Sequence, residues 1–227
     1  MYGVSDEERK ININTASIEV LQRLVETVLG YEKEEAKKLA ISIVDWRQYG
    51  ETEIEGFLSS NYYSNLEYPY EEKKAPFERI EELLLIGGID EGVYRKLSDF
   101  LTVYGDGPVN LNTASKAVLT ATGLTDGLVN KLIIARRGQD GLEATQDDYT
   151  FNQETNFNQV AVDFGFSLEE RRELNALIGQ YLLGTQSQFF RIESKARLHD
   201  ENKMIVCIFK AAGRSIMYWR ESYQSTP

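Results

Sequence analysis

The chain has few of the residues that build the most common catalytic and metal sites. Among 227 residues it has one cysteine, Cys207, and one histidine, His199. A single cysteine excludes an internal disulfide, and without clustered cysteine and histidine a zinc site is not expected. His199 precedes Asp200 in an expected turn, and the sequence has no recognisable nucleophile motif or phosphate-binding loop. We therefore do not expect an enzyme.

Cationic residues and long apolar runs are also scarce. The chain has 25 Lys and Arg against 36 Asp and Glu, which gives a formal net charge of −11 and a pI of about 4.8. Nucleic acids and anionic membrane surfaces would therefore meet a net repulsion. No apolar run approaches the roughly 18 residues needed to span a bilayer, and residues 1–6 do not form a signal sequence. We expect the chain as given to be soluble, and its abrupt start before Ile11 suggests a trimmed protein.

One segment of the sequence occurs twice. Residues 11–21, beginning Ile-Asn-Ile-Asn-Thr-Ala-Ser, return as residues 109–119, beginning Val-Asn-Leu-Asn-Thr-Ala-Ser. In both copies the apolar spacing changes from two residues to the spacing of one helix face. This pattern predicts a short extended segment followed by a helix, with Asn14 or Thr15, and Asn112 or Thr113, as the N-caps.

The second copy continues into a turn, Gly-Leu-Thr-Asp at residues 123–126, and a further amphipathic helix. Such a unit resembles the helix-hairpin-helix module of DNA-binding proteins, in which backbone N–H groups of the hairpin approach a phosphate. Here a carboxylate occupies the place of the phosphate, which favours a packing module over a nucleic-acid site. The alternative function, a DNA-binding protein of the competence type, would use Lys131, Arg136 and Arg137.

The most acidic loop follows this helix, at residues 138–148. Asp140, Glu143, Asp147 and Asp148 surround a glycine that lets the backbone fold back. Carboxylates in such a loop can present oxygen ligands to a hard cation such as Ca²⁺. The loop is not an EF-hand, because Phe151 stands where the closing glutamate would be. On these residues alone, a plain solvated acidic loop explains the pattern equally well.

The remaining pattern predicts helices and then strands. Ser167 and Glu170 form a capping box, and residues 75–77 begin a helix whose buried face would carry Ile80, Leu83, Leu84 and Ile86. The other expected helices are residues 32–49, 91–101 and 167–184, and residues 50–76 are expected to form a long loop. The expected antiparallel strands are residues 188–198, 203–211 and 214–221, with turns at 199–202 and 212–213.

The middle strand of these three is apolar on both faces. Met204, Val206 and Ile208 alternate with Ile205, Cys207 and Phe209. A sheet that is apolar on two faces needs cover on both. We expect the helices of this chain to supply one cover, and a helix N-terminal to Met1 to supply the other.

Several short motifs, taken in order, resemble one known family. They are Asn-hydrophobic-Asn-Thr-Ala at 12–16 and 110–114, Asp-Trp-Arg at 45–47, Tyr-Tyr at 62–63, Ala-Pro-Phe at 75–77 before Glu-Glu-Leu-Leu-Leu-Ile at 81–86, Leu-Thr-Val-Tyr-Gly at 101–105, and Met-Tyr-Trp-Arg-Glu at 217–221. This combination resembles the GspK minor pseudopilins of bacterial type II secretion, over nearly the whole chain.

The resemblance implies an α+β fold, a truncated pseudopilin fold. A small antiparallel sheet would carry a large inserted α-helical domain with two helix-hairpin-helix-like repeats. Residues 1–14 would join the sheet to the insertion, residues 15–184 would form the inserted domain, and residues 185–227 would form the antiparallel strands. The long hydrophobic N-terminal helix of the family would be missing from this portion.

The resemblance also implies a function. It implies a noncatalytic minor pseudopilin that caps the tip of the type II secretion pseudopilus and assembles with I and J type minor pseudopilins to support protein secretion. The native form would be anchored in the bacterial inner membrane through the missing helix, with this portion in the periplasm and without nucleic-acid partners.

Some members of the family bind Ca²⁺ in the helical domain, and the acidic loop is the matching place in this chain. We predict structural Ca²⁺ held by carboxylates, together with the carbonyls of Leu142 or Thr145. The expected ligands are Asp140, Leu142, Glu143, Thr145, Asp147 and Asp148. Ala144 stands where related chains often have glycine, and residues 50–56 lack the aspartate-rich pattern of a second site.

Overall fold

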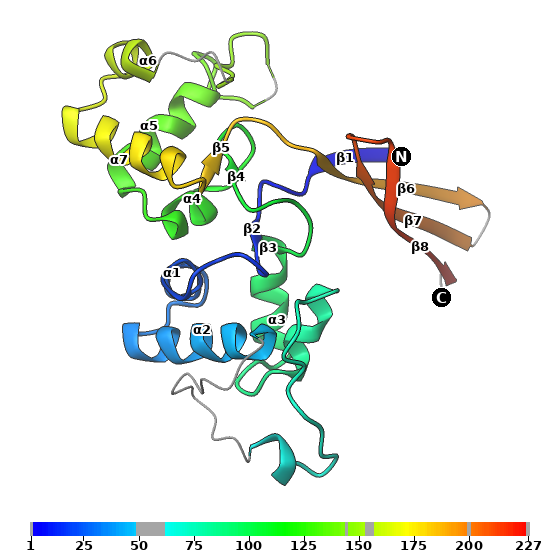
Figure 1. Ribbon diagram of the computed structural model, residues 1–227. Helices are drawn as coiled ribbons and strands as arrows, with labels where there is room; N and C mark the ends of the chain where they lie inside the picture. Colours follow the sequence, from blue (N-terminus) through cyan, green and yellow to red (C-terminus); the bar gives the residue numbers. More distant parts are fainter. Residues whose placement is uncertain (1, 49–61, 144, 153–156, 199–200, 226–227) are drawn as a thin grey trace.

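The computed structural model describes residues 2–48, 62–143, 145–152, 157–198 and 201–225. A helical body stands beside a four-stranded antiparallel sheet that projects from it (Figure 1). The sheet has the order β1-β6-β7-β8 and is built from both ends of the chain. Its strands are β1 (Tyr2–Asp6), β6 (Phe189–Leu198), β7 (Glu201–Lys210) and β8 (Ser215–Ser225). The mixed α+β class predicted from the sequence is confirmed.

The helical body contains seven α-helices within the described ranges. They are α1 (Ile18–Leu29), α2 (Lys33–Arg47), α3 (Glu91–Leu97), α4 (Lys116–Thr122), α5 (Asp126–Arg136), α6 (Phe157–Asp163) and α7 (Leu168–Gly179). Short 3₁₀ helices cover Tyr63–Asn65, Ile80–Leu85 and Ser98–Phe100. One continuous apolar core joins these helices, and Ile13, Leu24, Leu111 and Leu128 are among its fully buried members.

The two sequence repeats have matching surroundings. Each begins with a two-residue strand, β2 (Ile11–Asn12) or β4 (Val109–Asn110). Each of these strands pairs in parallel with a later one, β3 (Leu101–Thr102) or β5 (Leu183–Gly184). The helices that follow, α1 and α4, pack against each other. The likeness of these repeats to helix-hairpin-helix modules, and the domain boundaries 1–14, 15–184 and 185–227, stay predictions.

The predicted N-caps of the repeat helices are wrong. Ser17 and Ser115 cap α1 and α4, because their hydroxyl oxygens accept from the N–H groups of Val20 and Val118, at 3.3 Å in both cases. The asparagines are used instead to hold other parts of the backbone, as described below. The capping box at Ser167 is confirmed, since Ser167 and Glu170 exchange both bonds.

Several predicted boundaries are also corrected. A strand, β1, precedes Ile11, so the chain does not start abruptly there. Residues 80–85 form a 3₁₀ helix in which Leu84 is 43% exposed, because the helix is too short to bury a full face. The helices predicted to reach residues 101 and 184 end at Leu97 and Gly179, and the residues at those predicted ends pair as β3 and β5.

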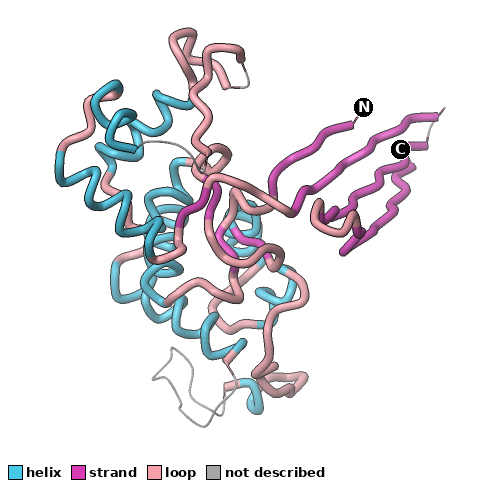
Figure 2. The backbone as a smooth tube through the Cα atoms, turned by 45° about the horizontal axis from the view of Figure 1, so that its top comes forward, coloured by secondary structure: helices cyan, strands magenta, loops and turns pink. Residues whose placement is uncertain are grey.

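The three C-terminal strands are confirmed near their predicted positions, and Cys207 is a buried free thiol in β7. The predicted turn at residues 199–202 is too long, because β7 already begins at Glu201. His199 and Asp200 lie outside the described residues. Both ends of the described chain lie toward the tip of the sheet that points away from the helices (Figure 2).

Candidate functional site

In each repeat, the side chain of the second asparagine binds both backbone polar groups of a phenylalanine in a distant loop. Asn112 donates from Nδ2 to the carbonyl oxygen of Phe151 and accepts at Oδ1 from the Phe151 N–H, both at 2.8 Å. Asn14 makes the same two bonds with Phe77, at 2.9 and 2.7 Å. In the second repeat, the fixed Phe151 marks the end of the acidic loop.

An arginine at the end of the second helix completes each repeat. Arg136, only 6% exposed, donates to the carbonyl oxygens of Leu111 and Ala114 at 3.1 and 2.6 Å. Arg47 donates to the matching carbonyls of Ile13 and Ala16. Burial lowers the pKa of Arg47 to about 10, which still leaves the guanidinium charged at neutral pH. The acidic loop therefore runs between two fixed points, Arg136 and Phe151.

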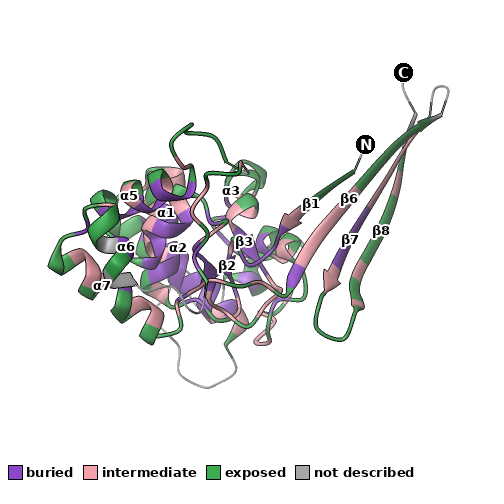
Figure 3. Ribbon diagram, turned by 90° about the horizontal axis from the view of Figure 1, so that it is seen from above, coloured by how far each residue is buried: buried purple, intermediate pink, exposed green. Residues whose placement is uncertain are grey.

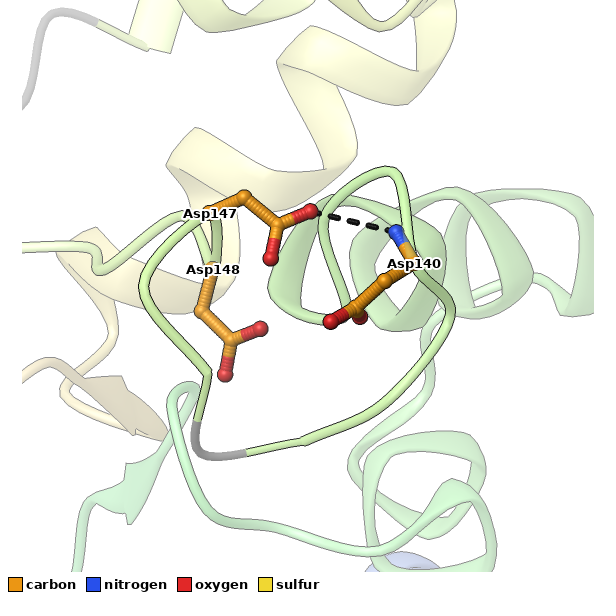
Figure 4. A group of neighbouring side chains, drawn as sticks. All are labelled: Asp140, Asp147 and Asp148. Atoms are coloured by element: carbon orange, nitrogen blue, oxygen red, sulfur yellow. Dashed lines mark hydrogen bonds between the residues drawn. The ribbon is translucent and has the colours of Figure 1, made fainter.

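Three aspartates of this loop lie together. Asp140, Asp147 and Asp148 each present a carboxylate oxygen, and these oxygens lie within 4.8 Å of one another. Figure 4 shows the three side chains directed toward the inside of the loop. Three hard oxygen donors on an exposed loop suit Ca²⁺, which takes carboxylate and carbonyl oxygens in flexible geometry. This group could hold a metal ion.

Asp147 is the best fixed of the three. Its Oδ1 accepts from the hydroxyl of Thr145 at 2.8 Å, and its Oδ2 accepts from the backbone N–H of Asp140 at 3.1 Å. These bonds, with that of Thr145 first, lower the pKa of Asp147, so the carboxylate is ionised and available to a cation at neutral pH. Gly138 has a φ of +59°, and a Cβ there would lie 2.4 Å from Asp147 Oδ2. The turn therefore requires glycine.

The other predicted ligands have different surroundings. Glu143 is turned to two arginines, with its Oε1 3.2 Å from Arg136 Nη2 and 3.3 Å from Arg137 Nε. Leu142 donates its N–H to Asp140 Oδ1 at 2.8 Å, and Thr145 Oγ1 also donates to Asp148 at 3.0 Å. Ala144 lies outside the described residues. The ligand set of six residues stays a prediction, and the structure gathers three of its carboxylates.

Three consecutive buried acids, Asp6, Glu7 and Glu8, join the sheet to the helical body, and no pattern in the sequence predicts their role. Asp6 accepts from Asn110 Nδ2 (3.0 Å), Thr113 Oγ1 (2.5 Å) and Ser187 Oγ (2.6 Å). Glu7 accepts from Thr102 Oγ1 at 2.8 Å. Glu8 accepts from the N–H of Phe189 at 3.2 Å, and its burial raises its pKa. β1, β3, the second repeat and the start of β6 therefore meet at these carboxylates.

One face of the sheet is open. Side chains that are paired across antiparallel strands share a face. Val4, Ile192, Cys207 and Trp219 form one such row across all four strands, and Ile216 lies in the next row. Val4 is 62% exposed, Ile216 57% and Trp219 51%. We call the face that carries this row the open face.

The opposite face of the sheet turns to the helical body. Val206 and Ile208 of this face are 4% and 1% exposed. Between them and the body lies a cavity of about 410 Å³, lined by Tyr218 and Arg220 of β8 and by body residues such as Tyr94. Figure 3 shows the sheet leaving the body with exposed residues along its outer strands. Body residues approach this face only across the cavity, so the expectation that the helices cover one face of the sheet stays a prediction. The second face has no helix against it within the described part of the chain.

The cations proposed for DNA binding all have partners in the protein. Lys131 Nζ lies 2.7 Å from Glu170 Oε2, Arg136 is buried on backbone carbonyls, and Arg137 contacts Glu143. Arg136 is therefore withdrawn from solvent, and the carboxylates beside Lys131 and Arg137 would repel a phosphate. The DNA-binding alternative is therefore not supported by the geometry.

Comparisons with known proteins agree on one family. The family model "Type II secretion system (T2SS), protein K" matches residues 4–106. Type II secretion system protein K of Pseudomonas aeruginosa is 26% identical over 208 residues, which cover 90% of this chain and 56% of the relative. The chain is thus similar to the type II secretion system protein K (GspK) family. It spans only a little over half the length of this curated relative.

A solved structure has a similar fold. The chain described here is similar to a chain in the crystal structure of the GspK-GspI-GspJ complex from the type 2 secretion system of enterotoxigenic Escherichia coli. The TM-score is 0.71 at 14% identity, over 97% of this chain and 79% of that chain. Among the residues that the structure describes, no helix combines the length and apolarity needed to cross a membrane.

Proposed function

We propose that the chain is part of a noncatalytic minor pseudopilin that caps the tip of the type II secretion pseudopilus and assembles there with I and J type minor pseudopilins. The similarity to type II secretion system protein K and the likeness to the GspK-GspI-GspJ complex support the assignment to this machinery. The single observation that carries the assembly role is the open face of the sheet, with Val4, Ile216 and Trp219 all at least half exposed.

The open face has the chemistry of a packing surface for a helix. Apolar area left in water forfeits about 25 cal/mol per Å² of the stabilisation that burial would give. Contiguous exposed apolar residues usually mark an interaction surface. Tyr2 begins β1 at the outer end of the sheet, so a hydrophobic helix preceding it would lie beside this face (Figure 2). Such a helix would anchor the protein in the inner membrane, with this portion in the periplasm.

The bulk of the helical body supports a place at the tip. It stands beside the sheet and occupies far more of the chain than the sheet does (Figure 1). A subunit of such bulk would obstruct further subunits stacked above it, but it fits at the end of a filament. The acidic loop belongs to this body, where Ca²⁺ on Asp140, Asp147 and Asp148 would have a structural role.

Copurification tests this proposal. The chain with a preceding hydrophobic helix is coexpressed with I and J type minor pseudopilins of the same bacterium, and the complex is sized by light scattering. We expect a single complex that contains all three proteins. Val4→Glu should weaken it at least about tenfold, because a buried unpaired carboxylate is costly. Ile134→Glu on α5 is a matched control, since Val4 and Ile134 are both 62% exposed.

Two results would contradict the proposal. The first is the absence of a complex when the unaltered, folded proteins are combined. The second is equal assembly by the Val4→Glu and Ile134→Glu variants, which would show that the open face takes no part.

A further inference from the structure

A second feature of the sheet, its edge at β8, is separate from the open face. Within the described ranges β8 pairs only with β7, so it is the last strand of the sheet. Figure 3 shows β8 along the outer border of the projecting sheet. Every second residue of an antiparallel edge strand points its N–H and C=O away from its neighbour. β8 has 11 residues, so it presents a long row of backbone donors and acceptors.

Natural proteins usually protect such an edge with charged side chains, especially lysine, with proline, or by a short strand or a bulge. β8 contains no lysine, proline or glycine. The register shift in its pairing with β7 lies near the start of β8, between the pairs Phe209–Ile216 and Ile208–Tyr218. The pairing is regular from Tyr218 to Ser225. The opposite edge, β1, is shorter, with five residues, and contains Gly3. With only Arg220 and Glu221 charged and its bulge near one end, β8 is therefore the longer and less protected of the two edges.

The side chains of β8 define what an added strand should carry. On the open face, Trp219 and Tyr223 are 51% and 66% exposed and would lie beside apolar side chains. On the opposite face, Arg220 forms no ion pair with any residue that the structure describes. Glu221, in contrast, already forms an ion pair, with its Oε2 2.8 Å from Lys203 Nζ. The edge thus favours a strand with apolar residues on one face and a carboxylate beside Arg220 on the other.

We propose that β8 accepts an extended segment of a partner polypeptide as a fifth strand of the sheet, in which apolar residues alternate with polar ones and an acidic residue lies beside Arg220. This goes beyond the proposed function, because a helix on the open face and a strand at the edge occupy different surfaces. Main-chain hydrogen bonds supply the affinity in this mode, and the alternate side chains supply the specificity.

A second copy of this chain fits the edge less well. When two copies pair through β8, the Arg220 face of one copy lies on the same side as the Arg220 face of the other. Among residues 218–222 this face carries only Tyr218, Arg220 and Ser222, because Glu221 lies on the opposite face. The copy could not supply the carboxylate that Arg220 lacks. Each copy also carries a formal charge of −11, which opposes self-association.

A tethered strand tests the proposal without an identified partner. The full chain is extended after Pro227 by a flexible Gly/Ser linker of about ten residues and a strand of about seven residues, Val-Thr-Val-Glu-Val-Thr-Val. The tether gives an effective concentration on the order of millimolar, which reveals even weak strand addition. Hydrogen exchange of the β8 amides is followed by NMR. We expect alternate amides in residues 218–223 to exchange at least about tenfold more slowly.

Variants that exchange the charges of the tether and of Arg220 provide the matched control. A tether with lysine in place of glutamate should protect the same amides less, and Arg220→Glu should restore protection by the lysine tether. Circular dichroism confirms that each variant is folded. No added protection in β8, protection of β1 instead, or equal protection by both tethers would overturn the proposal. Dimerisation of the untethered chain through β8 would also overturn it in favour of a second copy.

Discussion

Asn112 holds Phe151 by both of its backbone polar groups, through two hydrogen bonds of 2.8 Å. The two residues lie 39 positions apart, with the acidic loop between them. Asn14 holds Phe77 in the same way across 63 positions. The repeated asparagine is therefore a device for closing a long loop, and the second copy closes the loop that carries the candidate metal site.

Removal of this device should destabilise the fold. We expect Asn112→Ala to lower the free energy of unfolding by about 1–3 kcal/mol, because it leaves the backbone groups of Phe151 without their partner. Asn14→Ala should have a similar effect through Phe77. Urea unfolding measures both, with exposed Gln146→Ala as the control. A loss as small as that of the control would show that the clamp adds nothing.

Replacement of the neighbouring residues Arg136 and Arg137 should have very different effects on the free energy of unfolding. The Arg136 side chain is 7% exposed and that of Arg137 is 48% exposed, although both contact Glu143. Arg136→Met should cost about 2–4 kcal/mol, because the carbonyls of Leu111 and Ala114 lose their donor inside the protein. Arg137→Met should cost no more than about 0.5 kcal/mol, as an exposed pair contributes little. Equal losses in chemical unfolding would contradict the backbone role of Arg136.

Calcium should stabilise the protein through the three aspartates. An ion that binds only the folded state adds about 2.7 kcal/mol when its free concentration is a hundred times Kd. We expect Tm to rise between chelator and millimolar Ca²⁺. Asp147→Asn should remove most of the rise, whereas the exposed Asp99→Asn, in the 3₁₀ helix Ser98–Phe100, should leave it unchanged. An unchanged Tm on addition of Ca²⁺ to the unaltered chain would rule out the site.

Two glycines of the acidic loop allow a sharper test of its geometry. Gly138 and Gly141 both have positive φ, +59° and +73°. A Cβ at Gly138 would lie 2.4 Å from Asp147 Oδ2, while at Gly141 nothing lies within 4 Å. Both alanine variants strain the backbone, but only Gly138→Ala should also displace Asp147. Calorimetric titration should show a larger loss of Ca²⁺ affinity for Gly138→Ala, and the reverse order would contradict the assigned role of Asp147.

The buried acid Glu8 should give a pH dependence of unusual sign. Burial raises its folded-state pKa above the ordinary 4.5, against the opposing bonds from the Gln188 and Phe189 N–H groups, and nearby Asp6 and Asp106 raise it further. A raised pKa means that the contribution of Glu8 is fully present below pH 4.5 and is lost as pH rises through the folded-state pKa. Glu8→Gln keeps an acceptor oxygen and removes the charge.

We therefore expect the stability of Glu8→Gln relative to the unaltered chain to increase from about pH 4 to about pH 7. Urea unfolding at several pH values measures the difference. A difference that stays constant, or that changes in the opposite direction, would show that the charge of Glu8 is not penalised in the folded state.

Local patterns in the sequence predicted the regular elements best. The periodicity of two in residues 188–221 found three strands of the sheet, and the capping box at Ser167 found the start of α7. The strand β1 was missed because Tyr-Gly-Val-Ser-Asp has little apolar alternation, and its pairing partner Ile192 is far along the chain. The acidic loop was found from its composition, but composition does not show that Glu143 turns to two arginines.

By itself the sequence determined that this protein has a repeated strand-to-helix segment, an acidic loop and strands with apolar residues on both faces, because periodicity and composition are local properties. Only the tertiary structure decided which acids gather, which arginines are buried on carbonyls, and how Asp6, Glu7 and Glu8 join the sheet to the body. The arginine bonds join residues 22 to 34 positions apart, and the bonds of the buried acids join residues 95 to 181 positions apart. Packing decides which of these contacts form, and no local pattern responds to packing.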